Sequence, residues 1–241
     1  MIESRIHPRN NSHSESAILL EAVSKLFGRF AALHDLTATL AGGRLYALLG
    51  ENGAGKTTLL RIIAGLARPS RGNVQVFGAD ARAVSARIGY MAHATLLYDE
   101  MNARENLDYF RGLYAGRATA STNELLEMVG LAEVDPRRRV GQYSQGMKQR
   151  LALARAILAS PDLLLLDEPF SNVDSKSIAT MARLLGSLRD RGTTLLVITH
   201  QLDALSGIAD EWITLHAGTI IRRAPGRLEA NPARTPSRAI E

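Results

Sequence analysis

The stretch GENGAGKTT, which begins at Gly50, has the residue types and spacing of a phosphate-binding loop. Its glycines let backbone amides turn toward phosphate oxygens, Lys56 brings a positive charge to the outer phosphates, and the Thr57 hydroxyl is placed to reach Mg²⁺. The runs RLYALLG before it and LLRIIAGL after it supply the strand, loop and helix context that this pattern requires. We therefore expect a nucleotide to be bound by Gly50, Glu51, Asn52, Gly53, Ala54, Gly55, Lys56, Thr57 and Thr58.

Two carboxylates follow the apolar run LLLL, at the end of a predicted buried strand. Asp167 is suited to hold Mg²⁺ through water, and Glu168 is suited to take a proton from an attacking water. Such a pair is usually a solvated strand edge or a helix cap, but beside a phosphate-binding loop the catalytic interpretation is favoured. His200 ends the apolar run TTLLVIT, from where it could donate to a γ-phosphate, although a single histidine at a strand end is more often structural.

A second anion site is predicted in YSQGMKQRLALARAIL, which begins at Tyr143. A helix that starts at Ser144 points unpaired amides and about half a positive charge out of its N-terminus, beside the serine hydroxyl. Gly146 lets the backbone come close to an anion. A site that faced the chain's own phosphate loop would be redundant. We expect Ser144, Gln145 and Gly146 instead to face outward and to close over the nucleotide of another copy.

Strand-like and helix-like segments alternate in a way that positions these sites. The runs AILLEAV, LTATL, RLYALLG and NVQVFG predict a small sheet around the first phosphate site. Residues 102–114 and 121–131 have the helical spacing of apolar residues, and Ser121 followed by Glu124 predicts a capping box. DLLLLDE and TTLLVITH are typical of parallel strands covered on both faces, and WITLHAGTIIRR predicts a closing hairpin.

The composition is that of a globular protein with a core, because 46% of the 241 residues are hydrophobic. The absence of cysteine excludes disulfide and thiolate chemistry. The formal net charge of +5 is compatible with nucleic acid or an anionic membrane face, but many soluble proteins are as basic. No apolar run approaches the roughly 18 residues of a membrane span, and MIESRIHPRNNSHSES does not resemble a secretory signal, so we expect a cytosolic location.

The order of these motifs resembles the ATP-binding subunit of ABC transporters, from about Ile18 to Arg222. The resemblance implies an α/β fold: a P-loop NTPase with a RecA-like parallel-sheet core, a small antiparallel β subdomain and an inserted α-helical subdomain. We expect a disordered leader at residues 1–16, an ATP-binding domain at 17–223 with its helical insert at about 94–160, and a flexible tail at 224–241.

In that family two subunits sandwich two ATP molecules head to tail, each between the phosphate loop of one subunit and the signature of the other. The resemblance thus implies ATP and Mg²⁺ as cofactors and the sequence from Ser144 to Met147 as the signature. It implies Thr57 and Asp167 at the magnesium, Glu168 as catalytic base and His200 as the switch histidine.

Two further residues take roles from the resemblance. SNVD, which ends at Asp174, resembles the D-loop that links the two nucleotide sites. Phe27 matches the aromatic residue that stacks on adenine, and simple core packing is an equally good interpretation.

The chain departs from the family pattern at two motifs. The signature usually reads Leu-Ser-Gly-Gly-Gln, whereas YSQGM stands here; the hydroxyl and the second glycine, which touch the anion, are kept. His93 occupies the position where the family usually has glutamine. We expect a neutral ring nitrogen of His93 to touch the magnesium or its water, with a loop histidine facing the membrane partner as the alternative.

The resemblance also implies partners: a transmembrane permease and a second ATP-binding subunit, identical or related, at the cytoplasmic face of the cell membrane. The segment RENLDYFRGLYAG resembles the part that docks on the permease, and its pattern is most similar to exporters, including haem exporters of cytochrome c maturation. The triplet from Arg137 to Arg139 is interpreted as a solvated basic face, with contact to anionic lipid as the alternative.

Two other functions compete with transport. A soluble ATPase of the same superfamily acting on ribosomes or nucleic acid usually has two ATPase units or a long coiled coil, for which 241 residues without sustained heptads leave no room. We therefore expect no nucleic acid partner. A GTPase is disfavoured because the chain has no Asn-Lys-x-Asp or Thr-Lys-x-Asp motif for guanine.

Overall fold

A computed structural model describes residues 16–114 and 119–226 of the chain. Its centre is a six-stranded sheet with the strand order β10-β9-β3-β8-β7-β6. All neighbouring strands in it are parallel except β9 and β10, which form the predicted closing hairpin. The strands are β3 (Leu45–Leu49), β6 (Ile88–Met91), β7 (Leu163–Asp167), β8 (Thr194–Ile198), β9 (Glu211–His216) and β10 (Thr219–Pro225).

The strands β7 and β8 are buried along their whole length, as their apolar runs predict. Along β7, Leu163 and Leu165 pack into one hydrophobic cluster, whereas Leu164 and Leu166 pack into another. Successive strand residues point to opposite faces, so both faces of the sheet are covered. The polar residues that follow each strand therefore emerge only at its carboxyl end.

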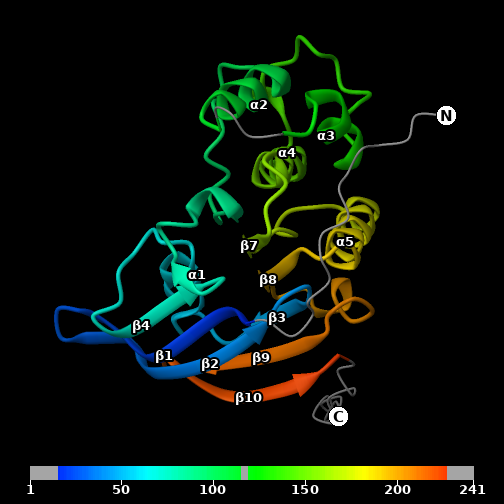
Figure 1. Cartoon of the computed structure of the whole chain (residues 1–241). Helices are drawn as coiled ribbons and strands as arrows, with labels where there is room; N and C mark the ends of the chain where they lie inside the picture. Colours follow the sequence, from blue (N-terminus) through cyan, green and yellow to red (C-terminus); the bar gives the residue numbers. More distant parts are fainter. Residues whose placement is uncertain (1–15, 115–118, 227–241) are drawn as a thin grey trace, which may run out of the picture.

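A second sheet, antiparallel and with the order β2-β1-β4-β5, lies against the first (Figure 1). It consists of β1 (Ser16–Phe27), β2 (Phe30–Ala41), β4 (Arg71–Val76) and β5 (Ala79–Asp80). β1 and β2 form a long hairpin with only Gly28 and Arg29 at its tip, where Gly28 has a φ of 59°. The hairpin thus ends in a tight turn flanked by Phe27 and Phe30.

In the described part of the chain, five α-helices accompany the sheets: α1 (Lys56–Ile63), α2 (Ala103–Gly112), α3 (Thr122–Met128), α4 (Gln145–Ile157) and α5 (Ser175–Asp190). Figure 1 shows α2, α3 and α4 gathered on the side away from the β1–β2 hairpin. The capping box predicted at Ser121 and Glu124 is present, and Asn102 with Glu105 forms another at the start of α2. These polar side chains set where both helices begin.

The structure confirms the α/β fold and refines several boundaries. β1 begins at Ser16 and β10 runs to Pro225, so each enters the end segments predicted to lack structure; the remainder of those segments lies outside the described residues. Sequence analysis did not predict α5 or β6. None of the helices in residues 16–114 and 119–226 has the length and hydropathy needed to cross a membrane.

Candidate functional site

The phosphate-binding loop connects β3 to α1, in the predicted context. Gly50 has a φ of 147°, and a Cβ atom there would lie 2.2 Å from the carbonyl oxygen of Leu215. Gly55 has a φ of 100°, and a Cβ atom there would lie 2.4 Å from the carbonyl oxygen of Ala32. Both positions therefore require glycine, because β9 and β2 close in on the loop from outside.

Lys56, the first residue of α1, is buried to 8% exposure at the centre of this loop. Its Nζ donates to the carbonyl oxygens of Gly50 at 2.6 Å and Glu51 at 2.9 Å. An ammonium group has three N–H donors, so one remains for a phosphate oxygen. The loop thus holds its lysine in place before any contact with an anion.

The next residue of α1 connects the loop to the sheet. Thr57 Oγ1 donates to Asp167 Oδ2 at 2.8 Å, although the two residues are 110 positions apart. Asp167 ends β7 and is 3% exposed. A hydroxyl and a carboxylate oxygen are ligands that Mg²⁺ accepts, and Mg²⁺ usually combines one or two such ligands with phosphate oxygens and water. The described residues contain no cluster of three or more His, Asp or Glu that would form an all-protein metal cage, in keeping with this mode.

Glu168 follows directly and has a backbone φ of 55°, an uncommon conformation for a residue other than glycine. Its Oε2 accepts from the backbone N–H of His200 at 3.3 Å. Its Oε1 is buried and accepts no hydrogen bond from any described residue, although His200 Nε2 lies 3.4 Å away and would pair with it when protonated. A carboxylate oxygen that is held in place but lacks a donor is suited to accept a proton from water.

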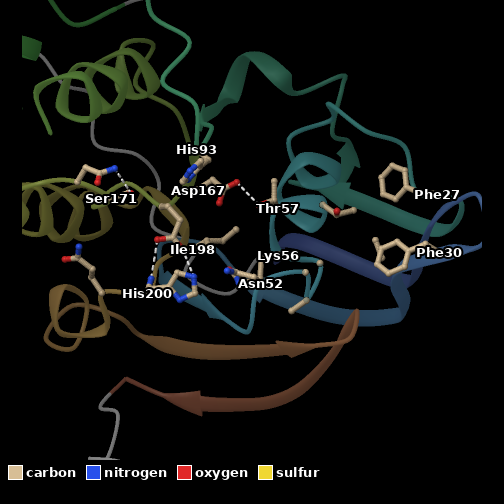
Figure 2. A pocket seen from close by; sticks show the side chains of 18 residues that line it. Phe27, Phe30, Asn52, Lys56, Thr57, His93, Asp167, Ser171, Ile198 and His200 are labelled. Carbon is tan, nitrogen blue, oxygen red and sulfur yellow. Dashed lines mark hydrogen bonds and ion pairs between the residues drawn. The ribbon is translucent and has the colours of Figure 1, made fainter. Parts of the chain in front are cut away.

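These groups line one cavity of about 690 Å³. Figure 2 shows Thr57 bonded to Asp167 on the cavity wall, with Lys56 and Asn52 below them in this view and Phe27 and Phe30 at the far end. His93 also lines the cavity. Of the predicted residues, the cavity brings together Phe27, Asn52, Gly53, Ala54, Gly55, Lys56, Thr57, Thr58, His93, Asp167, Glu168 and His200. Gly50 and Glu51 lie just behind, where their carbonyls hold Lys56.

Core packing does not account for Phe27, because the residue is 56% exposed. Phe30 is 62% exposed and lines the same cavity. Phe27 and Phe30 are directly paired across β1 and β2, and directly opposed residues of a sheet share a face. Two phenyl rings thus stand at the cavity mouth on one face of the hairpin tip.

The predicted second anion site has the expected helix start but lies outside this cavity. Ser144 caps α4, and its Oγ accepts from the backbone N–H of Met147 at 3.2 Å. Ser144 and Gln145 are exposed, whereas Gly146 is buried against the loop after β7, where an added Cβ would lie 3.0 Å from the Asn172 carbonyl oxygen. The start of α4 is therefore not part of the chain's own phosphate site.

Asp174 also lies outside the cavity lining. It caps α5, and its Oδ1 accepts from the backbone N–H of Ser177 at 2.9 Å. Hydrogen bonding with Ser177 lowers the pKa of the Asp174 carboxyl. Asp174 has a structural task within the chain, whatever it contacts in an assembly.

Two residues of the cavity wall, Phe30 and Gln201, were not predicted from the sequence. Ser171 and Asn172, the first residues of the SNVD segment, also line the cavity. Phe30 could have been found, because a two-residue turn between Phe27 and Phe30 places both on one face. Gln201 had no such signal, since its place depends on a side-chain bond to the Phe170 carbonyl oxygen at 3.2 Å.

The motifs and their geometry agree with a comparison against protein families. The family described as ABC transporter matches residues 33–171, more than half of the chain. The chain belongs to the ABC transporter family. It is similar to the daunorubicin resistance ATP-binding protein DrrA3 of Streptomyces coeruleorubidus, at 38% identity over 215 residues that cover 86% of this chain and 68% of DrrA3.

Other ABC proteins are similar over comparable lengths. The ABC transporter ATP-binding protein NatA of Bacillus subtilis (strain 168) is 38% identical over 83% of each chain. Among solved structures, a dimeric ATP-binding cassette in a post-hydrolysis state, bound to ADP and Pi, superposes with a TM-score of 0.80 at 26% identity, over 88% of this ABC chain and 100% of that one.

Membership of the family makes the chain an ATPase. ABC cassettes bind and hydrolyse ATP, and this chain keeps the P-loop lysine, the hydroxyl–carboxylate pair and the unpaired glutamate oxygen in one cavity. The chain is an ATP-binding subunit whose hydrolysis is coupled to transport. The comparisons do not favour the alternative of a soluble ATPase that acts on ribosomes or nucleic acid.

Proposed function

We propose that two copies of this ABC subunit, or one copy and a relative, close head to tail over two MgATP molecules and thereby drive a separate transmembrane permease. The observation that carries this proposal is the position of Ser144. Ser144 and Gln145 are exposed and lie outside the chain's own phosphate cavity, so the Ser144 hydroxyl proton and the positive end of the α4 dipole are available to a γ-phosphate bound by another subunit.

In this proposal each residue of the site has one role. Gly50–Thr58 and Lys56 bind the phosphates, Thr57 and Asp167 hold Mg²⁺, and Phe27 stacks on the base. Glu168 accepts the proton of the attacking water at its unpaired Oε1, and His200, next to it, contacts the γ-phosphate. His93 touches the magnesium or its water from the wall beside Asp167.

In this proposal, the segment from Ser171 to Asp174 links the two nucleotide sites of the dimer. Gly146 of the signature packs on the Asn172 carbonyl oxygen, and Asn172 also lines the nucleotide cavity. Asn172 thus connects the cavity of one nucleotide to the signature that would contact the other nucleotide. Asp174 fixes this segment by capping α5.

The permease docks, in this proposal, near the loop after His93 and α2. Tyr98 and Tyr109 are exposed there, with ring centroids 5.0 Å apart, and Leu96 in the loop and Leu113 at the end of α2 are also exposed. Exposed aromatic and aliphatic side chains at one place are typical of a protein interface. The subunit would then lie at the cytoplasmic face of the membrane without crossing it.

We propose export as the direction of transport. The sequence pattern is most similar to exporters, and among the similar proteins one is named for daunorubicin resistance and another for Nod factor export. Others are named for import of sulfate or Fe(3+), so the direction rests on the pattern and is tested by transport of a substrate with the permease in vesicles.

The dimer is tested with Glu168→Gln, which removes the base but keeps the side-chain size and the acceptor for the His200 N–H. This variant is expected to bind MgATP, to lose turnover and to accumulate a species of twice the 26.1 kDa monomer mass in light scattering after gel filtration. The matched control is Glu168→Gln combined with Lys56→Ala, which is expected to stay monomeric. A monomer for Glu168→Gln at saturating MgATP would refute the proposal.

A further inference from the structure

The contacts of Arg155, near the end of α4, are not explained by packing alone. Its Nη1 donates to the carbonyl oxygens of Thr95 and Leu96, both at 2.9 Å, and its guanidinium lies 5.0 Å from the centre of the Phe110 ring. No carboxylate of the described residues lies within ion-pair distance of it. Burial lowers the pKa of this guanidinium, which shows the cost of placing the charge there.

A methionine or leucine would fill the same space without that cost. An arginine is distinguished from them by its N–H donors, and one of its nitrogens, Nη1, here binds two successive carbonyl groups of one loop. The contact therefore acts on the backbone at Thr95 and Leu96 rather than on the core.

That backbone is strained. Leu96 has a φ of 52°, a left-handed conformation that is a genuine outlier for a bulky side chain, and its side chain is exposed, so its own packing does not hold it there. Such a conformation persists only where surrounding contacts impose it. The two hydrogen bonds from Arg155 are contacts of that kind.

The strained loop is short and carries His93. The segment leaves β6 at Met91, His93 lines the nucleotide cavity, and Thr95 is bound by Arg155. One end is thus fixed by the sheet and the other by α4, the helix that begins with the signature serine.

We propose that Arg155 is a positioning residue for His93: by holding the Thr95 and Leu96 carbonyl groups, it keeps the loop strained and the imidazole against the nucleotide site. The inference rests on the proposed role of His93 in ATP hydrolysis. Without the guanidinium the loop relaxes and His93 leaves the cavity wall. The P-loop contacts and the Thr57–Asp167 bond do not involve this loop and remain.

The test is a double-mutant cycle between Arg155→Met and His93→Ala. Arg155→Met keeps the alkyl packing and removes the donors. It is expected to lower kcat about ten-fold, since small displacements of a reacting group have effects of this size, and to leave the Kd for MgATP unchanged. In the His93→Ala background, Arg155→Met is expected to have no further effect on kcat, because the group it positions is absent.

Arg150 offers a matched control on the same helix. Its Nη1 donates to the carbonyl oxygens of Val129 and Gly130, at the end of α3 and away from the loop. Arg150→Met is expected to affect stability and to act independently of His93→Ala. If Arg155→Met and His93→Ala multiply in their effects on kcat, or if Arg150→Met shows the same coupling, the positioning role is refuted.

A second measurement needs no turnover. In Arg155→Leu, which has an apolar side chain and no hydrogen-bond donor, amide hydrogen exchange is expected to quicken at residues 94–97 and to stay unchanged at residues 50–58. If Arg155→Met does not fold, this variant takes its place in the double-mutant cycle. Unchanged exchange at 94–97 would overturn the proposal. Absence of ATPase activity in the unaltered protein would instead overturn the proposed function.

Discussion

At the scale of single residues, the site depends on polar groups that are already fixed by protein partners. Lys56 is bound to two carbonyl oxygens, Thr57 to Asp167, and Glu168 to a backbone N–H, and each keeps one donor or acceptor unused. Such preorganisation reduces what the nucleotide must reorder when it binds. It also makes each side chain separately testable.

Lys56→Ala is expected to raise the Kd for MgATP on the order of 10- to 100-fold, because a charge-assisted contact to phosphate is lost. Isothermal titration calorimetry measures this Kd. The matched control is Lys148→Ala, since Lys148 binds Asp99 outside the cavity. Equal affinities for the Lys56→Ala variant and the unaltered protein would contradict the assignment of the phosphate loop.

At the scale of elements, the β1–β2 hairpin is the part that reaches from one sheet to the nucleotide site of the other. Its two-residue turn puts Phe27 and Phe30 side by side at the tip, both exposed at the cavity mouth. A nucleotide base can stack on an exposed phenyl ring, because stacking requires no matching hydrogen bonds.

Phe30→Ala is expected to weaken MgATP binding by roughly 5- to 100-fold, the range for one lost stacking contact, while leaving the affinity for inorganic tripolyphosphate unchanged. Competition against a fluorescent ATP analogue measures both. Ile221→Ala, a similarly exposed apolar position on β10, serves as the control. If the affinity of Phe30→Ala for tripolyphosphate fell as much as its affinity for MgATP, Phe30 would support the phosphate loop rather than contact a base.

α3 provides a contrast, because its capping box lies far from the cavity lining. Ser121→Ala removes the acceptor for the Glu124 N–H and is expected to lower the free energy of unfolding by about 1 kcal/mol. Chemical denaturation measures this loss. Turnover of the folded variant is expected to stay unchanged, and a fall in kcat would show that the helical segment is coupled to the site more tightly than its contacts indicate.

At the scale of the whole molecule, the proposed dimer divides each nucleotide site between two chains. The phosphate cavity lies at the carboxyl ends of β3, β7 and β8, whereas the signature lies at the start of α4, outside it. A single subunit therefore cannot close both on the same nucleotide, and symmetry supplies the missing half.

This geometry predicts complementation between two inactive variants. Lys56→Ala and Ser144→Arg chains are each expected to lack turnover, since every site in their homodimers has one damaged half. Mixed one to one, they are expected to regain about a quarter of the normal rate, because half of the dimers are mixed and each has one intact site. The steady-state ATPase rate of the mixture checks this. A rate equal to the mean of the separate variants would contradict a shared site.

The chain's local patterns determined much of the fold and the site. The phosphate loop, the Asp167–Glu168 pair and the start of α4 at Ser144 were predictable, because each depends on contiguous residues whose conformation and chemistry are local. The apolar runs of β7 and β8 likewise predict buried parallel strands, since strands covered on both faces need apolar residues throughout. The weak signals of α5 and β6 were missed.

Only the tertiary structure decided which of these groups meet. Thr57 and Asp167 bond across 110 residues because β7 and β3 both flank β8, an order that no local pattern encodes. The same long-range arrangement brings Phe30 and His93 into the cavity, leaves Ser144 outside it and places Arg155 against the loop after His93. Contacts between distant segments depend on how all the elements pack at once, and a reading of one segment at a time does not contain that information.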